Sequence, residues 1–421
     1  MKLTNRQHGM NRNVIQKKAV QLIDQSNVVA LKWATGAGKS KAALMMVDYI
    51  SKKKITDHKL EVLICVAESA HKQNWIDEIN KHGFTKLFNF TIECYASLKK
   101  HKYSSWDIII FDEAHHLSTS LRLDIIDNLT ARYTILLSAT ISDDKIRDIG
   151  GKFGYVAVDT VTLEDVIEWD ILPEPEVILI PMELDNTACD CTITESWGSA
   201  KKRVRYECEF KDRWTYCAHR DKYPDVELTI KCTQHQKYMY LCSQVDYWRT
   251  RYIRRRKEFA KNKWMLCGSE RKRFIGDLKT SIAMHLVSSI KQRFICFCSS
   301  IGQANLIGGN NEVLHHKLNK GIICNRINKF NTGELNRLFA VGMLQEGQNL
   351  RNIEAGVIIQ LDGKEGKFIQ KLGRTLRSKE KPKVYILYYK NTVDTTYLQH
   401  VYNSVPHNCV TEAPVELFKQ R

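Results

Sequence analysis

The sequence contains no long apolar run and little proline, and both absences limit the class of protein. No stretch of its 421 residues approaches the roughly 20 apolar residues that a membrane-spanning helix needs. Only seven residues are proline and 43 % are hydrophobic, so a globular chain is expected rather than a disordered one. The N-terminal stretch has no apolar core, which argues against a secretory signal. These absences predict a cytoplasmic protein with no membrane partner.

Acidic residues are too few to balance the basic ones. The chain has 64 Lys and Arg against 47 Asp and Glu, a formal net charge of +17. A protein this basic usually meets a polyanion, most often nucleic acid, although a basic surface without a partner is the alternative. The 13 cysteines are odd in number and follow no export signal, which fits a reduced, intracellular compartment.

Short apolar runs alternate with amphipathic stretches in two blocks, as buried strands of parallel sheets do. The runs of the first block are 28–33, 62–67, 107–111, 133–137 and 177–181. Those of the second block are 293–298, 338–343, 356–361 and 384–389. This alternation predicts two α/β domains. The expected division is a first domain, an accessory insertion, a second domain and a tail, at 1–183, 184–267, 268–392 and 393–421.

The segment between the blocks is polar, aromatic and basic. Alternation over 203–211 and 227–232 predicts strands of a small antiparallel sheet, and 238–264 predicts one or two helices. Its densest basic run is interleaved with aromatic residues, which suits phosphate contacts and base stacking. The alternative is a solvated helix face with packed aromatics, and the two can coexist. The nucleic-acid-binding candidates are Arg249, Arg251, Arg254 and Arg255.

Five cysteines and a histidine in the same segment raise the question of zinc. Structural zinc sites usually show two close pairs such as CxxC. Here one CxC is followed by scattered single residues, so buried or free thiols are favoured over a metal site. The residues are Cys189, Cys191, Cys208, Cys217, His219 and Cys232.

A glycine-rich loop joins the run 28–33 to a helix predicted over 41–52. Its glycines let backbone N–H groups turn inward around phosphates, and the helix N-terminus adds partial positive charge. Lys39 would supply a cation to the β- and γ-phosphates of ATP, and the Ser40 hydroxyl a ligand to Mg²⁺. Trp33 stands where the full pattern has glycine. The ATP-binding candidates in the loop are Thr35, Gly36, Ala37, Gly38, Lys39 and Ser40.

Two carboxylates follow the run 107–111. The carboxyl end of a strand near the P-loop is where Mg²⁺ must be held, so Asp112 is expected to bind the ion directly or through water. Glu113 would orient and deprotonate the attacking water. Acidic residues are also common at helix N-termini. The position after a P-loop and intervening strands favours the catalytic interpretation.

These motifs resemble those of superfamily 2 helicases, and the resemblance covers nearly all of the chain. Residues 112–115 spell the DEAH box, and 138–140 are similar to motif III. The resemblance implies that Ser138 and Thr140 couple hydrolysis to movement. It also implies that His115 contacts Gln370 and so links the ATP cleft to the nucleic-acid groove.

Two further elements of the first block fit the same family. Arg12 and Gln16 lie upstream of the P-loop like the family element whose glutamine reads adenine, with Ile15 in place of the usual tyrosine. Residues 62–67 and 73–78 are similar to motif Ia and its following helix, which in the family touch the nucleic-acid backbone.

The second block completes the series. Residues 293–299, 342–350 and 370–377 resemble motifs IV, V and VI, with Glu346 and Gly347 of motif V expected at the nucleotide. The resemblance places Arg374 and Arg377 at the γ-phosphate, where planar, permanently charged groups stabilise the transferring phosphoryl. A surface helix with basic residues at i, i+3 is the alternative for these arginines.

The expected fold is therefore α/β, with two RecA-like domains whose parallel sheets stand in tandem, plus the accessory insertion. The expected activity is an ATP- and Mg²⁺-dependent DNA helicase or translocase acting in replication, recombination or repair, with protein partners in those processes. The motifs look nearest to the XPB-like and phage recombination-helicase branch, and the compact length suggests a phage protein in the host cytoplasm. An RNA helicase and a catalytically inactive nucleic-acid binder are the alternatives.

Overall fold

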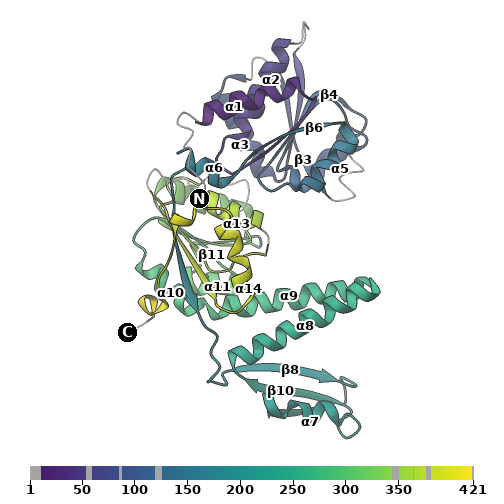
Figure 1. Ribbon diagram of the computed structural model, residues 1–421, viewed down its shortest axis with the longest axis vertical. Coiled ribbons are helices and arrows are strands. Elements are labelled where there is room, and N and C mark those ends of the chain that lie inside the picture. The colour runs from purple at the N-terminus through teal and green to yellow at the C-terminus, as the bar shows by residue number, and fades with distance from the viewer. Residues whose placement is uncertain are drawn as a thin grey trace, which may run out of the picture.

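The computed structural model describes residues 11–53, 59–84, 88–118, 126–343, 350–363, 365–375 and 381–419 (Figure 1). Two parallel sheets with flanking helices stand in tandem, the first domain in purple to blue above the second in green to yellow. A third, smaller region projects from the second domain on the side away from the first. The predicted α/β fold with two tandem sheets is confirmed.

The first domain is built on six parallel strands in the order β3-β2-β4-β5-β1-β6. Its central strands are almost fully buried, because helices cover both faces of the sheet. The strands are β1 (Val28–Trp33), β2 (Leu60–Val66), β3 (Phe88–Cys94), β4 (Ser105–Asp112), β5 (Thr130–Ser138) and β6 (Val156–Val161). The helices are α1 (Arg12–Val20), η1 (Gln21–Asp24), α2 (Lys39–Lys53), α3 (Ser69–Lys81), η3 (Tyr95–His101), η4 (Ala114–Ser118), α5 (Asp143–Phe153) and α6 (Leu163–Glu168).

The second domain has seven parallel strands in the order β12-β13-β11-β14-β15-β7-β16. They are β7 (Glu176–Met182), β11 (Phe294–Phe297), β12 (Val313–His315), β13 (Arg337–Val341), β14 (Ala355–Ile358), β15 (Lys383–Tyr389) and β16 (Val410–Glu412). The helices are α10 (Thr280–Ser289), α11 (Ile301–Gly308), α12 (Lys320–Thr332), α13 (Glu365–Thr375), α14 (Val393–Tyr397), α15 (Gln399–Tyr402), η6 (His407–Cys409) and η7 (Val415–Phe418).

Strand β7 corrects one sequence-based assignment. The run 177–181 was expected in the first block, but β7 pairs in parallel with β15 and β16 and so belongs to the second sheet. An apolar run identifies a buried strand, but it does not say which sheet supplies the partners. The chain therefore enters the second sheet before it leaves for the accessory region.

The accessory region combines a small sheet with a helical hairpin. The sheet holds β8 (Cys191–Trp197), β10 (Val226–Cys232) and β9 (Val204–Glu209) in that order, with α7 (Arg213–Ala218) beside it. The expectation of an antiparallel sheet is half right: β10 is antiparallel to β8 but parallel to β9. The connection from β9 to β10 contains α7, and such a crossover allows parallel pairing.

The two helices predicted as an alternative over 238–264 are α8 (Gln234–Arg255) and α9 (Glu258–Leu278), which together are called the arm. Thr233 begins α8 with a capping box, and Arg256 ends it in a left-handed conformation, φ 49°, that turns the chain into α9. Figure 1 shows the arm projecting sideways, with α9 running back into the second domain.

A buried ion pair fixes the C-terminal end of α9 in the second domain. Lys279 follows the last residue of α9, and its Nζ lies 2.6 Å from Asp394 Oδ2, with both side chains 0 % exposed. The same ammonium donates to the carbonyl oxygens of Ile359 at 2.9 Å and Leu387 at 3.0 Å. Burial lowers the pKa of Lys279, and the Asp394 carboxylate opposes that shift.

Replacement of Lys279 by Met should destabilise the second domain, because it leaves the Asp394 carboxylate buried without its cation. Loss of one partner from a buried pair typically costs about 3–5 kcal/mol. Urea unfolding followed by far-ultraviolet circular dichroism and by hydrogen exchange of the second-domain amides would measure this free energy. Lys291→Met removes an exposed lysine of the same domain and should be close to neutral. Equal unfolding midpoints for the two variants would contradict the prediction.

Candidate ATP site

The P-loop lies where the sequence predicts it, between the end of β1 and the start of α2. Gly36 and Gly38 have φ values of 93° and 94°, which residues with a side chain rarely adopt. A Cβ at position 38 would also lie 2.3 Å from Gln16 Nε2. Lys39 begins α2, and its Nζ donates to the carbonyl oxygens of Trp33 at 3.0 Å and Ala34 at 3.4 Å. The lysine therefore folds over the loop that would hold the phosphates.

Trp33 occupies the glycine position of the P-loop pattern without entering the loop. It is the last residue of β1 and is 0 % exposed. Its indole N–H donates to Asp159 Oδ2 at 2.6 Å. The ring therefore packs inside the first domain, and the turn that follows keeps its glycines.

Helix α1 brings Gln16 to the same loop. Gln16 is fully buried, and its Nε2 donates to the Gly38 carbonyl at 3.1 Å. Its Oε1 is buried and accepts no hydrogen bond from the described residues. An acceptor of this kind fits the exocyclic amine of adenine. Arg12 is exposed and donates to the Ile171 carbonyl at 3.1 Å, whereas Ile15 packs in the core.

Asp112 ends β4, and two aromatic side chains hold it in place. Trp75 of α3 donates its indole N–H to Asp112 Oδ2 at 2.9 Å. The Tyr95 hydroxyl donates to the Asp112 carbonyl at 2.7 Å. Burial, and then the neighbouring charge of Glu113, raise the pKa of Asp112, while Lys39 and His71 act in the opposite direction. A divalent cation would neutralise this largely buried pair of carboxylates, and carboxylate oxygens are the ligands that Mg²⁺ prefers.

Glu113 has a left-handed backbone, φ 49°, which costs on the order of 1–3 kcal/mol and commonly marks functional sites. Its N–H donates to Asp112 Oδ1 at 3.1 Å, which helps to hold this turn. Glu113 Oε2 lies 3.4 Å from His115 Nδ1, and the same nitrogen lies 3.1 Å from Ser138 Oγ. The N–H of Thr140 donates to that hydroxyl at 3.1 Å. The DEAH and SAT segments are thus joined by His115 and Ser138.

The second domain approaches the P-loop through α13, the helix of the motif VI residues. A Cβ at Gly373 would lie 2.9 Å from the Cβ of Thr35, so glycine allows α13 to lie close against the P-loop here. Gln370 is buried on the same helix, and its expected contact with His115 stays a prediction. The side chain of Arg374 and the residues Arg377, Glu346 and Gly347 lie outside the described part of the chain.

Three residues beside Asp112 were not predicted from the sequence for this role. Trp75 was expected on a helix that touches nucleic acid, but it is 2 % exposed and faces Asp112. Tyr95 carries no motif, so only its place after β3 brings it to Asp112. His71 is also buried, and its Nε2 has no hydrogen-bond partner among the described residues. A tryptophan at an amphipathic helix position is a weak signal, because packing alone explains it.

The arginines predicted to bind nucleic acid lie on the arm, away from the P-loop (Figure 1). All four are exposed, while their aromatic neighbours pack α8 against α9. Trp248 meets Phe259 edge-on with ring centroids 5.7 Å apart, and Tyr252 stacks on Trp264 at 6.0 Å. Arg251 folds back, donating to the Tyr247 hydroxyl at 2.6 Å. The aromatics therefore serve the hairpin, and the remaining arginines face solvent.

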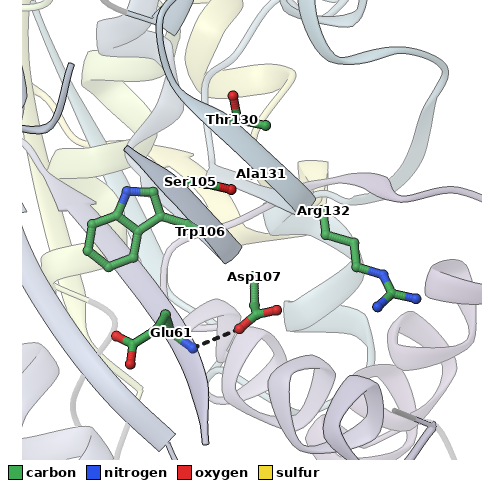
Figure 2. Close-up of a pocket in the computed structure, with 7 residues that line it drawn as sticks. All are labelled: Glu61, Ser105, Trp106, Asp107, Thr130, Ala131 and Arg132. Atoms are coloured by element: carbon green, nitrogen blue, oxygen red, sulfur yellow. Dashed lines mark hydrogen bonds between the residues drawn. The ribbon is translucent and has the colours of Figure 1, made fainter. Parts of the chain in front are cut away.

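A cavity of about 330 Å³ opens on the first domain, but at the wrong edge of the sheet for the ATP site (Figure 2). Its walls come from the beginnings of β2, β4 and β5, whereas the P-loop and Asp112 lie at strand ends. Figure 2 shows Trp106 and Arg132 on opposite sides, with Asp107 accepting from the Glu61 N–H at 3.0 Å. The lining residues are Glu61, Ser105, Trp106, Asp107, Thr130, Ala131 and Arg132. No predicted site residue lies among them.

The cysteines of the accessory region do not assemble a metal site among the described residues, where no group of three or more His, Cys, Asp or Glu could hold an ion. Cys191 and Cys232 are neighbours across β8 and β10. All 13 cysteines are free thiols. Nor does any helix in the described ranges have the length and apolar character to cross a membrane.

Two family models match the chain, one in the first domain and one in the second. The model described as "Type III restriction enzyme, res subunit" matches residues 1–143, and "Helicase conserved C-terminal domain" matches residues 278–379. The chain belongs to helicase superfamily 2. The first match covers the P-loop and the DEAH box, and the second covers α13. As a superfamily 2 member, the chain is an ATP-dependent nucleic-acid helicase.

Solved superfamily 2 structures share the two-domain fold. Dbp5 of S. cerevisiae, bound to RNA and ADP BeF3, matches with a TM-score of 0.56 and 13 % identity over 96 % of this chain and 90 % of its own. Mss116p, bound to single-stranded RNA and AMP-PNP, matches with a TM-score of 0.53 and 14 % identity over 95 % and 73 %. At such identities the likeness concerns the fold. No curated protein matches the sequence.

Replacement of Glu113 by Gln should leave ATP binding intact but lower kcat about 10²–10⁴-fold, since an amide cannot accept a proton from water. Single-turnover hydrolysis and nucleotide titration would separate the two effects. Glu61→Gln is the matched control, because Glu61 lies at the opposite edge of the same sheet and should leave kcat unchanged. Loss of nucleotide binding in Glu113→Gln would instead assign Glu113 a structural role.

Proposed function

We propose that the protein is an ATP-dependent DNA helicase or translocase that unwinds or remodels duplex or branched DNA in replication, recombination or repair. The observation that carries this proposal is that α13 meets the P-loop at Thr35 and Gly373, while Lys39 of the P-loop lies close enough to act on the charge of Asp112 in the DEAH box. A catalytically inactive binder is disfavoured, because the lysine, both carboxylates and both motif VI arginines are present. These are Lys39, Asp112, Glu113, Arg374 and Arg377.

The residues at the P-loop fit ATP and Mg²⁺. Gln16 Oε1 is a buried acceptor suited to adenine, and the φ values of Gly36 and Gly38 are those of a phosphate-binding turn, in which backbone N–H groups would face phosphate oxygens. Ser40 and Asp112 would hold Mg²⁺, which supplies charge neutralisation on the phosphates when bound. Lys39 binds phosphate oxygens, and Glu113 takes the proton of the attacking water. Arg374 and Arg377 would reach the γ-phosphate from α13 and the residues after it.

Two observations support DNA rather than RNA as the substrate. The family model that matches the first 143 residues is named for a restriction enzyme subunit, and restriction enzymes act on DNA. The motif VI and SAT sequences also look nearest to the XPB-like and phage recombination-helicase branch. The 13 free thiols support an intracellular setting.

The arm is the proposed accessory contact with nucleic acid. Residues 234–279 contain 13 Lys and Arg but four Asp and Glu, so this segment carries a net charge of +9 out of +17. Arg254 and Arg255 are exposed in the last turn of α8, at the free end of the hairpin. Phosphate contacts from this end would hold the duplex or a junction beside the motor without reading its sequence.

Replacement of both Arg254 and Arg255 by Gln should weaken binding to all DNA sequences alike. The slope of log K against log salt should fall by about one and a half units, since each phosphate contact accounts for about 0.7–0.9. Basal ATPase should not change. Lys17→Gln with Lys18→Gln is the matched control, an adjacent basic pair in the last turn of α1. An unchanged slope in the arm variant would mean that Arg254 and Arg255 face solvent and do not contact phosphates.

The experiment that tests the proposed function measures ATP hydrolysis by the wild-type protein with single-stranded, duplex and forked DNA and with RNA of the same sequences. DNA should raise kcat and RNA should not. Lys39→Ala should abolish turnover yet still bind DNA, because the phosphate loop and the arm are separate surfaces. Lys41→Ala, two residues along α2, is the control and should hydrolyse ATP normally. Stimulation by RNA alone would favour the RNA helicase alternative.

A further inference from the structure

The junction of the arm with the second domain holds charged groups that the proposed hydrolysis does not use. Helix α9 ends in the buried contacts of Lys279 with Asp394. Beside them, Gln303 Nε2 donates to the Gly276 carbonyl of α9 at 2.6 Å, and the Val393 N–H donates to the Tyr238 hydroxyl of α8 at 2.8 Å. Buried polar contacts of this kind hold both helices to the domain core. A force on the arm is therefore transmitted to the domain and not lost in a flexible joint.

One carboxylate connects the arm to the motif VI helix. Lys272 of α9 forms an ion pair with Asp362 Oδ1, and Lys371 of α13 forms another with Asp362 Oδ2 at 2.6 Å. The side chains of Asp362 and Lys371 are 10 % and 8 % exposed, and that of Lys272 is 35 % exposed. Burial alone would raise the pKa of Asp362, but the Lys371 and Lys272 ammonium groups hold it well below its usual range. Asp362 is thus charged and shared between two helices.

Lys371 lies close in sequence to the residues that face the P-loop. It is two residues before Gly373, which contacts Thr35, and three residues before Arg374, which is one helical turn away. Lys371 also donates to the Gln360 carbonyl at 3.1 Å, next to the end of β14. A shift of Lys371 along or around α13 therefore displaces Gly373 and Arg374 relative to the P-loop.

We propose that Lys272, Asp362 and Lys371 form a relay through which nucleic acid bound on the arm positions motif VI against the P-loop. The proposal rests on the proposed nucleic-acid-dependent ATPase. Lys272 is a positioning residue in it, since it touches neither nucleotide nor nucleic acid. A force that nucleic acid exerts on α9 acts through Lys272 on the Asp362 carboxylate, and the strength of the Asp362–Lys371 ion pair changes in response. Because Asp362 and Lys371 are largely buried, their electrostatic interaction is stronger than it would be in water, and a change in it has a large effect on the position of Lys371.

The test compares Lys272→Met with the wild-type protein in three assays. Basal ATPase and DNA binding should stay as in the wild type, because the arm tip and the P-loop are untouched. DNA-stimulated kcat should fall at least about fivefold, the lower end of typical coupling between sites. Lys272→Arg keeps the charge and should restore stimulation. Arg273→Met is the control, since Arg273 is exposed and pairs with Asp277 instead of Asp362.

A double-mutant cycle separates a relay from two independent effects. With Arg254 and Arg255 already replaced by Gln, the arm no longer delivers a signal, so Lys272→Met should reduce stimulation no further. If the two sets of substitutions reduce the DNA-stimulated kcat independently, so that their fold-changes multiply in the combined variant, the relay is overturned. So would full stimulation in Lys272→Met, or a basal ATPase that falls as much as the stimulated one.

Hydrogen exchange on α13 decides the relay independently of the proposed function. Without nucleic acid, the amides of α13 should exchange faster in Lys272→Met than in the wild type, and Arg273→Met should match the wild type. Unchanged exchange on α13 would overturn the relay. If neither DNA nor RNA raises the wild-type ATPase, the proposed function fails, whereas this exchange measurement still supports or overturns the link from α9 to α13.

Discussion

The approach of Gly373 to Thr35 limits how large a side chain can stand between the second domain and the P-loop. Any side chain at position 373 would meet the Thr35 Cβ, so α13 can lie against the P-loop only because this residue is glycine. Functional loops of parallel sheets gather at the carboxyl ends of their strands, where Thr35 follows β1 and Asp112 ends β4. The narrow contact brings the motif VI helix to that edge, where a nucleotide would be held between the two domains.

Polar groups withdrawn from water hold the active residues in position throughout the structure. In the first domain, Trp75 and Tyr95 fix Asp112 from two sides, and Ser138 fixes His115. In the second domain, Asp362 and Asp394 hold lysines from different helices. Isolated buried charges are costly, so each depends on its partners, and the elements that carry them have to move together. The rigid parts of the protein are therefore defined by these contacts as much as by the apolar cores.

Sequence patterns predicted most of the two sheets and the parts of the ATP site that stand in short motifs. The P-loop needs glycines at fixed offsets from a lysine, and a buried strand needs an apolar run, so local sequence carries both. Strands β3 and β6 were not predicted, because their partly exposed residues give no continuous apolar run. Strands β12 and β16 were also missed, because each has only three residues. The sheet that β7 joins, and the approach of Trp75 and Tyr95 to Asp112, depend on contacts between distant segments. No local pattern records such contacts.

The place of β7 determines how the molecule can move. In the described residues the chain passes from the first sheet to the second once, between α6 and β7, and every later strand belongs to the second domain or its accessory region. The domains therefore share one covalent connection, and the arm travels with the second domain as a lever. Helix α9, with 21 residues, is about 31 Å long, so each 10° of domain rotation across its axis moves its tip on the order of 5 Å farther than its base. That difference is comparable to the spacing of successive phosphates along a strand, so a small rotation between the domains would be enlarged along the arm to the scale of one nucleotide.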